Sequence, residues 1–175
     1  MALRPILIHP DPRLKRRCAP VEAVDDRVRA LIADMLETMY DAPGIGLAAP
    51  QLGVDARVVV MDCAGREEAP EPLRLVNPEI VWSSEETNEH EEGCLSLPDV
   101  FGMVTRPERV RVRWLDETGA EREAEFDGIR ATCVQHEIDH LNGRLFIDYL
   151  GTARRMMITE KMKKLKRERA KAGAA

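Results

Sequence analysis

The sequence is poor in aromatic side chains and has no long apolar run. Its 175 residues include two Trp, two Tyr and three Phe, so aliphatic side chains must form most of the core. No stretch approaches the roughly 20 consecutive apolar residues that a membrane span requires. The N-terminal segment "MALRPILIHPDPRLKRRC" also lacks the apolar region and the cleavage site of a signal peptide. These absences predict a cytoplasmic protein with no membrane partner.

Cysteine is scarce as well, with four residues in the chain. Thiols stay reduced in the cytoplasm, so we expect them to form no disulfide. Each cysteine is then either a small buried apolar side chain or a chemically active group. The four are Cys18, Cys63, Cys94 and Cys133.

Charges of opposite sign are separated along the chain, whose net charge is −5. Residues 151–175 contain nine Lys or Arg and two Glu, a local charge of +7, so residues 1–150 carry −12. A chain of this length is the size of one domain. We therefore expect residues 1–150 to form one acidic body, and residues 151–175 to form a basic helix that packs on this body or extends from it.

Hydrophobic periodicity places one helix before a run of strands. Apolar residues recur at helical spacing after Asp25 and Asp26, either of which can cap a helix, and Pro43 ends the pattern. Beyond it, short segments rich in β-branched residues or with alternating polarity are typical of strands. The predicted strands cover residues 57–62, 73–82, 109–116 and 120–126, and the last two form a hairpin.

Two further helices are predicted after the strands. One covers residues 128–141 and stops at Asn142-Gly143, and the other begins near Thr152. The order helix, strands, helix, helix favours an α+β fold over a regular βαβ alternation. We expect antiparallel or mixed sheets packed around the central helix 128–141, with one helix near the N-terminus and one at the C-terminus.

The motif "QHEIDH" (135–140) lies on this central helix. Positions four residues apart share one helical face, so His136 and His140 can bind the same cation. Glu137 follows His136 and can reach a water on that cation, as in the H-E-x-x-H pattern. The alternative is a helix whose two histidines serve only as hydrogen-bonding residues, so the spacing indicates a metal-binding helix without requiring one.

A catalytic metal needs a third protein ligand, so that the fourth position can hold water. Cys133 shares the helical face but lies seven residues from His140, about 10 Å along the axis, so we expect it to pack instead. Cys94, in "EEGCLSLP", lies in a short extended segment that Pro98 ends, and Gly93 permits close backbone approach. Spacing alone leaves five candidates open: Cys94, His90, His9, Cys18 and Cys63.

The segment "GIGLAAPQ" (44–51) is a glycine-rich loop without the Lys-Ser/Thr of a phosphate-binding loop, which argues against nucleotide binding. Its small residues suit close backbone approach, and Gln51 offers an amide donor of the kind that a developing oxyanion needs. The alternative is an ordinary turn between a helix and a strand.

The motifs "GIGLAAPQ", "EGCLSL" and "QHEIDH", in this order, resemble the three motifs of the peptide deformylase family. The resemblance covers nearly the whole chain and implies removal of the N-formyl group from nascent polypeptides that begin with formyl-methionine. Residues 1–150 would form the catalytic domain. It implies that Glu137 is the general base and acid, and that Gln51 and the backbone N–H of Leu95 stabilise the oxyanion. The implied metal ligands are Cys94, His136 and His140.

The resemblance also implies the cofactor and the substrate contacts. Family members typically use Fe²⁺, whereas Zn²⁺, Ni²⁺ or Co²⁺ can occupy the same site. Gly46 and Gly93 would meet the substrate backbone, and the methionine pocket would be lined by Ile45, Ile129 and Cys133.

Three more charged or polar residues belong to the expected site or its surroundings. Glu92 and Arg106 match charged positions of the family and could pair to support the site, although two solvated charges are the alternative. His90 lies four residues before Cys94, where we would expect many family members to place an apolar residue. We expect His90 to be a surface histidine of the acidic run "SSEETNEHEE" rather than a competing ligand.

The final helix resembles the C-terminal extension of bacterial family members. This resemblance implies an electrostatic contact with ribosomal RNA near the exit tunnel, without DNA as a partner. The charge itself is compatible with any polyanion, and a solvated helix packed on its own domain is the other interpretation.

Two other functions fit parts of the sequence. The first is an H-E-x-x-H metallopeptidase, which would need a later ligand, although no histidine follows His140. The second is a non-catalytic ribosome- or RNA-associated protein whose histidines are incidental.

Overall fold

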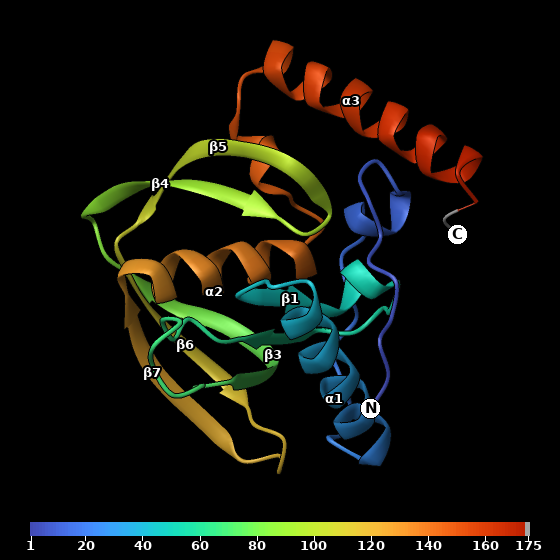
Figure 1. The fold of residues 1–175 in the computed structure, drawn as a ribbon. Coiled ribbons are helices and arrows are strands. Elements are labelled where there is room, and N and C mark those ends of the chain that lie inside the picture. Colours follow the sequence, from blue (N-terminus) through green and yellow to red (C-terminus); the bar gives the residue numbers. More distant parts are fainter. Residues whose placement is uncertain (174–175) are drawn as a thin grey trace.

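The computed structural model describes residues 1–173, and Figure 1 shows two antiparallel β-sheets on either side of one helix. The larger sheet has the strand order β1-β2-β3-β6-β7, and β4 and β5 form a separate pair. The strands of the larger sheet are β1 (Gly46–Ala48), β2 (Val58–Met61), β3 (Leu73–Ser83), β6 (Arg109–Leu115) and β7 (Glu121–Asp127). The smaller sheet consists of β4 (Thr87–Cys94) and β5 (Leu97–Pro107).

The helices of the described residues are α1 (Asp26–Asp41), α2 (Gly128–Leu141) and α3 (Thr152–Lys171). Short 3₁₀ turns cover Pro12–Lys15, Ala49–Leu52 and Phe146–Tyr149. This arrangement confirms the predicted α+β class, with the helix 128–141 at the centre. Every strand pairing between named strands is antiparallel.

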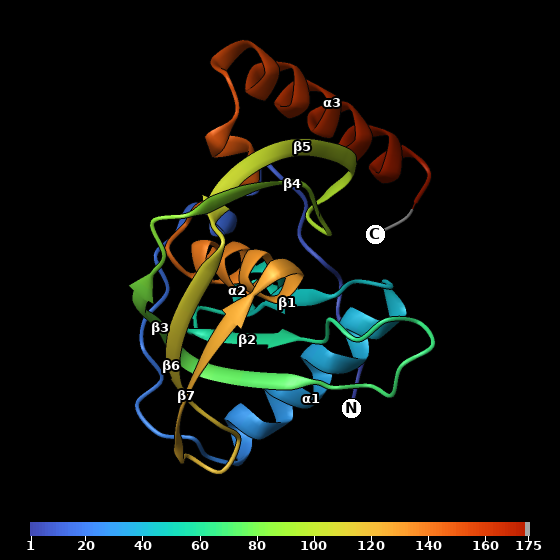
Figure 2. The same cartoon turned by 90° about the vertical axis from the view of Figure 1, so that its left-hand side faces the viewer.

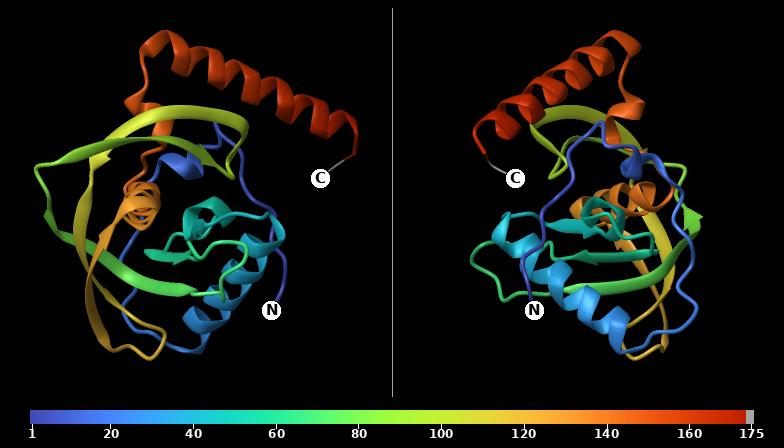
Figure 3. Two further views of the ribbon diagram at one scale, coloured as in Figure 1. Left: turned by 60° about the vertical axis from the view of Figure 1, so that its left-hand side comes forward. Right: turned by 90° about the vertical axis from the view of Figure 1, so that its right-hand side faces the viewer.

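Helix α2 lies between the two sheets, as the end-on view in Figure 3 (left) shows. Ten of its 14 residues are buried, so it contacts the protein interior around most of its circumference. One side packs on the large sheet through Val134, Ile138 and Leu141, which share a core with Val110 and Val112 of β6. The other side faces β4 and β5, and the polar side chains of the helix are therefore buried between the sheets.

Helix α1 forms as the sequence predicts. The Asp25 side chain accepts a hydrogen bond from the Val28 N–H at 3.0 Å, which caps the N-terminus of the helix. Its apolar face packs on β1 and β2 in a core that includes Met35 and Met39. This packing supports the segment "GIGLAAPQ" from one side (Figure 2).

Helix α3 lies along the outer surface of the β4–β5 pair (Figure 1). Ile158 and Met162 are buried in a core with Val100, Val104 and Phe146, while most other side chains of α3 are exposed. The predicted division at residue 150 stays a prediction, and residues 174–175 of the predicted basic segment lie outside the described residues. Within residues 1–173, no helix is both long and apolar enough to cross a membrane.

The β4–β5 hairpin corrects the sequence analysis. We expected a short extended piece around Cys94 that ends at Pro98, but residues 87–94 and 97–107 form two long paired strands and Pro98 lies inside β5. Strand β5 pairs only with β4, so a proline without an N–H donor is tolerated on this edge strand. The acidic run "SSEETNEHEE" is therefore largely a strand, and His90 lies within it, partly buried.

Candidate metal centre

Three potential ligand atoms converge where the end of β4 meets α2. The Cys94 Sγ lies 3.4 Å from the Nε2 of His140, and the two histidine Nε2 atoms lie 3.2 Å apart. All three atoms lie within 4.8 Å of one another, and they form the one such group of three or more that the described residues contain. The structure thus brings together Cys94, His136 and His140, whereas Cys133, His90, His9, Cys18 and Cys63 are outside this group.

These distances fit a single divalent cation. Tetrahedral bonds of about 2.0–2.1 Å to nitrogen and 2.3 Å to sulfur place neighbouring ligand atoms roughly 3.3–3.6 Å apart. The observed separations of 3.2 and 3.4 Å are close to these values. One thiolate with two imidazoles also suits iron or zinc better than magnesium or calcium.

A buried ion-pair network orients His136. Its Nδ1–H donates to the Glu92 Oε1 at 2.9 Å, which directs the Nε2 toward Cys94 and His140. The guanidinium of Arg106 donates to Glu92 at 2.7 Å and to Asp139 at 2.8 Å. Both Glu92 and Arg106 are 5% exposed, so the predicted pairing is confirmed and the alternative of two solvated charges is wrong.

Burial and hydrogen bonds shift the pKa values of the two histidines in opposite directions. Desolvation lowers the pKa of His140 well below its usual value, and the positive charges of His136 and Arg106 lower it further. His140 is therefore a neutral imidazole that can donate a lone pair. Burial alone lowers the pKa of His136, but hydrogen bonds with Cys94 and Glu92 outweigh this effect and raise it.

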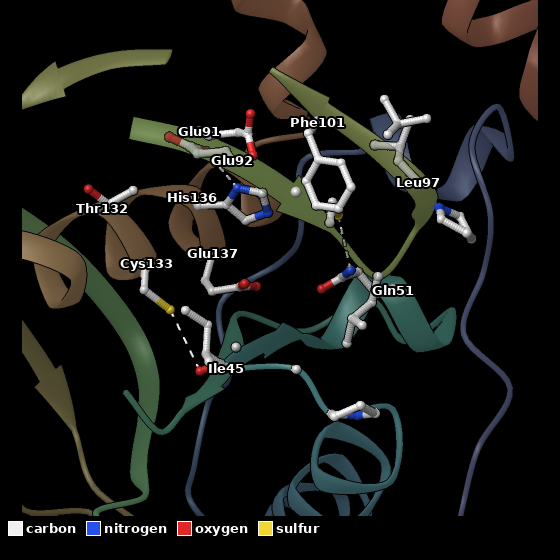
Figure 4. A pocket seen from close by; sticks show the side chains of 18 of the residues that line it. Ile45, Gln51, Glu91, Glu92, Leu97, Phe101, Thr132, Cys133, His136 and Glu137 are labelled. Atoms are coloured by element: carbon white, nitrogen blue, oxygen red, sulfur yellow. Dashed lines mark hydrogen bonds and ion pairs between the residues drawn. The ribbon is translucent and has the colours of Figure 1, made fainter. Parts of the chain in front are cut away.

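Glu137 lines the same cavity as Cys94 and His136 and is almost fully buried (Figure 4). Its desolvation raises the pKa of the carboxyl group to about 7. Its Oε2 has no hydrogen-bond partner among the described residues. A methyl group added at Gly46 would lie 2.6 Å from the Oε1, so the glycine lets the backbone of β1 approach the carboxylate closely. The carboxyl group is thus confined, and its Oε2 can accept or donate a proton.

Gln51 is held so that its amide N–H₂ points toward the ligand group. The Oε1 accepts from the Ala48 N–H at 2.9 Å, and the Nε2 donates to the Ser96 Oγ at 3.1 Å. The same Nε2 lies 3.5 Å from the Cys94 Sγ. The Gln51 amide is therefore a donor next to the sulfur, and Leu95 follows the sulfur-bearing Cys94 in the turn between β4 and β5.

A cavity of ≈ 530 Å³ opens onto this group, and Figure 4 shows the side chains around it. Ten residues to which the resemblance assigns a role in catalysis, metal binding or substrate contact line it: Ile45, Gly46, Gln51, Gly93, Cys94, Leu95, Ile129, Cys133, His136 and Glu137. His140 lies behind this lining, and His90 is not part of it. The predicted residues of three distant motifs therefore share one cavity.

Some residues of the site were missed from sequence. Ser96 orients the Gln51 amide, and its place in "EGCLSL" was a signal that could have been used. Asp139 binds Arg106 and accepts a hydrogen bond from the Tyr149 hydroxyl at 2.8 Å. Asp139 is three residues after His136, so it lies on a neighbouring part of the same helical surface. Phe101 also lines the cavity and packs against Gly93, a contact that depends on the unpredicted hairpin.

Known proteins resemble this chain in sequence and in fold. Residues 3–156 match the sequence profile described as polypeptide deformylase. Peptide deformylase of Methylocella silvestris is 56% identical over 94% of this chain and 85% of its own length. That of Rhizorhabdus wittichii is 53% identical over 97% and 98% of the two chains.

Solved structures agree with this relationship. The crystal structure of a peptide deformylase from Legionella pneumophila has a TM-score of 0.89 and 48% identity, covering 97% of this chain and 98% of its own. Peptide deformylase from Ehrlichia chaffeensis in complex with actinonin has a TM-score of 0.90 and 43% identity, covering 95% and 99%. The chain therefore belongs to the polypeptide deformylase family, the enzymes that remove the N-formyl group from nascent polypeptides by hydrolysis.

Proposed function

We propose a specific division of labour among the residues around the cavity. Glu137 is the general base and acid, and Gln51 with the backbone N–H of Leu95 binds the oxyanion. The metal ligands are Cys94, His136 and His140. One observation supports this assignment above the others: the three ligand atoms lie within 4.8 Å of one another beside a buried carboxylate. Membership of the family favours this hydrolysis over the metallopeptidase and adaptor alternatives.

A divalent cation at this position would polarise the formyl carbonyl and lower the pKa of a bound water from 15.7 toward about 7. Glu137 takes the proton from the attacking water and passes it to the departing amine, so that formate and a free amino terminus result. A carboxyl group with a pKa near 7 suits both transfers, because it can hold or release the proton at neutral pH.

Two donors stabilise the negative oxygen that develops on the former carbonyl. The Gln51 amide is held by Ala48 and Ser96, so it needs little reorganisation when the substrate arrives. The Leu95 N–H is the second donor. Removing one donor of this kind typically slows turnover by about 10²–10³.

The apolar part of the cavity is proposed to bind the methionine side chain. Ile45, Ile129 and Cys133 line it, while Gly46 and Gly93 allow the peptide backbone to approach. A side chain at Gly93 would lie 2.8 Å from the Phe101 ring, so this strand has no room for one. Burial of an unbranched thioether against these surfaces favours methionine at the first position.

The metal is proposed to be Fe²⁺ in the cell, with Zn²⁺, Ni²⁺ or Co²⁺ able to bind the same ligands. The mixed sulfur and nitrogen donors accept each of these ions. Divalent affinity generally favours Zn²⁺ over Fe²⁺, so metal supply decides which ion is bound. Metal analysis of protein purified without oxygen tests this proposal, and zinc as the predominant metal under those conditions would contradict it.

Substitution of Glu137 by Gln tests the assignment of the base. The variant should retain its metal, yet formate release from a formyl-Met peptide should fall by about 10²–10⁴. Glu89→Gln is a matched control, because Glu89 is an exposed carboxylate of β4 that does not line the cavity. Turnover of Glu137→Gln comparable to that of the control would refute the role of Glu137.

We also propose that α3 binds ribosomal RNA, which would place the enzyme in the cytoplasm where formylated chains emerge. Ile158 and Met162 face the body of the protein, so the basic residues of α3 remain on the outer surface. Deleting residues 159–175 should weaken ribosome binding in a salt-dependent manner and spare hydrolysis of short formyl peptides.

A full-length variant controls for this truncation. Lys163, Lys164 and Arg167 are exposed, and neutralising them with Gln keeps the buried side of α3 intact. The slope of log affinity against log salt should then fall by about one for each lost phosphate contact. Equal ribosome affinity and equal salt dependence for wild type and variant would exclude this binding mode.

A further inference from the structure

Two thiols meet behind the wall of the substrate cavity. Cys133, on α2, donates its S–H to the Ile45 carbonyl oxygen at 3.7 Å (Figure 4). The same carbonyl accepts the backbone N–H of Asp62 at 2.8 Å. Cys63 directly follows Asp62, so this shared acceptor brings Cys63 next to Cys133. Cys63 is partly buried and packs against the core cluster that contains Cys133.

The two thiols differ in their access to solvent. Cys133 is 5% exposed and belongs to the core between α2 and the large sheet. Cys63 is partly buried and lines a separate cavity of ≈ 140 Å³ on the other side of Ile129. Ile129 lines both cavities and separates them. A small oxidant can therefore reach Cys63 without passing through the active site.

Their chemistry is also asymmetric. The neighbouring Cys133 thiol, together with the charge of Arg130, lowers the pKa of Cys63 despite its partial burial. The neighbouring Cys63 thiol and burial raise the pKa of Cys133 well above its usual value. Cys63 is also the more exposed of the two thiols and lines the second cavity, so Cys63 is the nucleophile of the pair and Cys133 is the thiol that reacts second.

We propose that Cys63 and Cys133 are a redox modification site, at which a hydroperoxide converts the thiol pair into a reversible disulfide. The Cys63 sulfur attacks the peroxide, the O–O bond breaks, and Cys63 becomes a sulfenic acid with release of one water or alcohol. The Cys133 sulfur then attacks the Cys63 sulfur and a second molecule of water leaves. The two thiols lose two electrons and two protons, and the peroxide is reduced.

The disulfide would change the substrate cavity. An oxidised Cys133 has no S–H and cannot donate to the Ile45 carbonyl oxygen. Its sulfur also has to move toward Cys63, away from its place beside Gly46, where an added methyl group would lie 2.9 Å from it. Both changes affect the "GIG" backbone that borders Glu137. Loss of one hydrogen bond of ordinary strength corresponds to about a fivefold change in binding, so we expect KM for a formyl-Met peptide to rise by about that factor.

Peroxide treatment of zinc-loaded holoenzyme tests the proposal, because zinc itself has no redox chemistry. Peptide mapping by mass spectrometry should find Cys63 linked to Cys133, and dithiothreitol should remove the link and restore KM. Cys63→Ser should show neither effect. Cys18→Ser is the matched control and should behave like wild type, because burial raises the pKa of the Cys18 thiol and it lies elsewhere in the core.

The mass measurement does not depend on the proposed catalytic roles, so it can succeed or fail independently of them. Two results would overturn the proposal. One is the absence of a Cys63–Cys133 link under conditions that oxidise other thiols of the protein. The other is an equal, reversible rise in KM for Cys63→Ser and wild type, which would place the sensitive group elsewhere.

Discussion

Replacing Gly46 with alanine should disable the enzyme without removing its metal. The added methyl group would lie 2.6 Å from the Glu137 Oε1, 3.0 Å from its Cδ and 2.9 Å from the Cys133 Sγ. Ordinary contacts of such a carbon begin near 3.4 Å, so the Oε1 must retreat by about 0.8 Å. Glu137 and Cys133 are both at most 5% exposed and both line the substrate cavity, so a displaced carboxylate moves within that cavity and away from its present position.

The size of this displacement sets the expected loss. A shift of about 1 Å in a catalytic group can lower the rate by about 10²-fold, so kcat should fall by this order. None of the three atoms nearest to the added methyl group belongs to a proposed metal ligand, so metal content should be unchanged. Overpacking of a dense core should also lower the free energy of unfolding by about 1–3 kcal/mol.

Formate release under saturating formyl-Met peptide measures kcat, and denaturant unfolding measures stability separately. Gly151→Ala is the matched control, because nothing lies within 4 Å of a methyl group added there and its φ is −60°. The control should retain wild-type turnover. If Gly46→Ala keeps kcat within about twofold of wild type while its metal stays bound, the position of Glu137 does not limit the reaction and the reasoning is wrong.

Other perturbations test the surroundings of the site. Arg106→Met should lower the free energy of unfolding by about 3–5 kcal/mol, because it leaves the Glu92 carboxylate buried and unpaired, and metal competition should show about 10–100-fold weaker binding. Burial, with Lys15 nearby, lowers the pKa of His9 in the folded protein from 6.5 to about 4. As the pH falls, the unfolded chain therefore binds the proton at a higher pH than the folded chain does. The free energy of unfolding should fall as the pH drops from 6.5 to 4, by at most about 3 kcal/mol. Urea unfolding at pH 7 and 4.5 should show this fall in wild type and a smaller one in His9→Gln. Cys94→Ser should lose or exchange its metal, and unchanged iron content would exclude Cys94 as a ligand.

The elements that carry the site differ in how readily sequence predicts them. The observed bounds of helix α2 agree with the predicted ones. Gly143 has a φ of +76° and so provides the left-handed residue that ends a helix. Strand β6 was predicted from its strict alternation, which matches one buried and one exposed face. In both cases the signal is local, because the residues that decide the structure are neighbours in the chain.

The third proposed metal ligand required information that is not local. Spacing along α2 placed His136 and His140 on one face but could not choose among five further candidates. Cys94 lies near the two histidines because β4 pairs with β5 in a sheet that faces α2. This strand was not predicted, because β4 is a polar, acidic segment without an apolar repeat. The pairing of Cys63 with Cys133 is hidden for the same reason, since Cys63 follows β2 in a segment without a motif. Resemblance to a family supplied Cys94, and nothing in the sequence indicated the thiol pair.

The position of α2 between two sheets links the fold to the chemistry. Burial raises the pKa of Glu137 to about 7, where a carboxyl group can both accept and return a proton. The same burial lowers the pKa of His140, and the neutral imidazole is the form that the proposed metal ligand needs. It also makes an unpaired Glu92 costly, so Arg106 has to accompany it into the interior. A change that lets water reach α2 should therefore impair proton transfer and metal binding together. Variants that separate these two losses would show that burial of the helix is not their common cause.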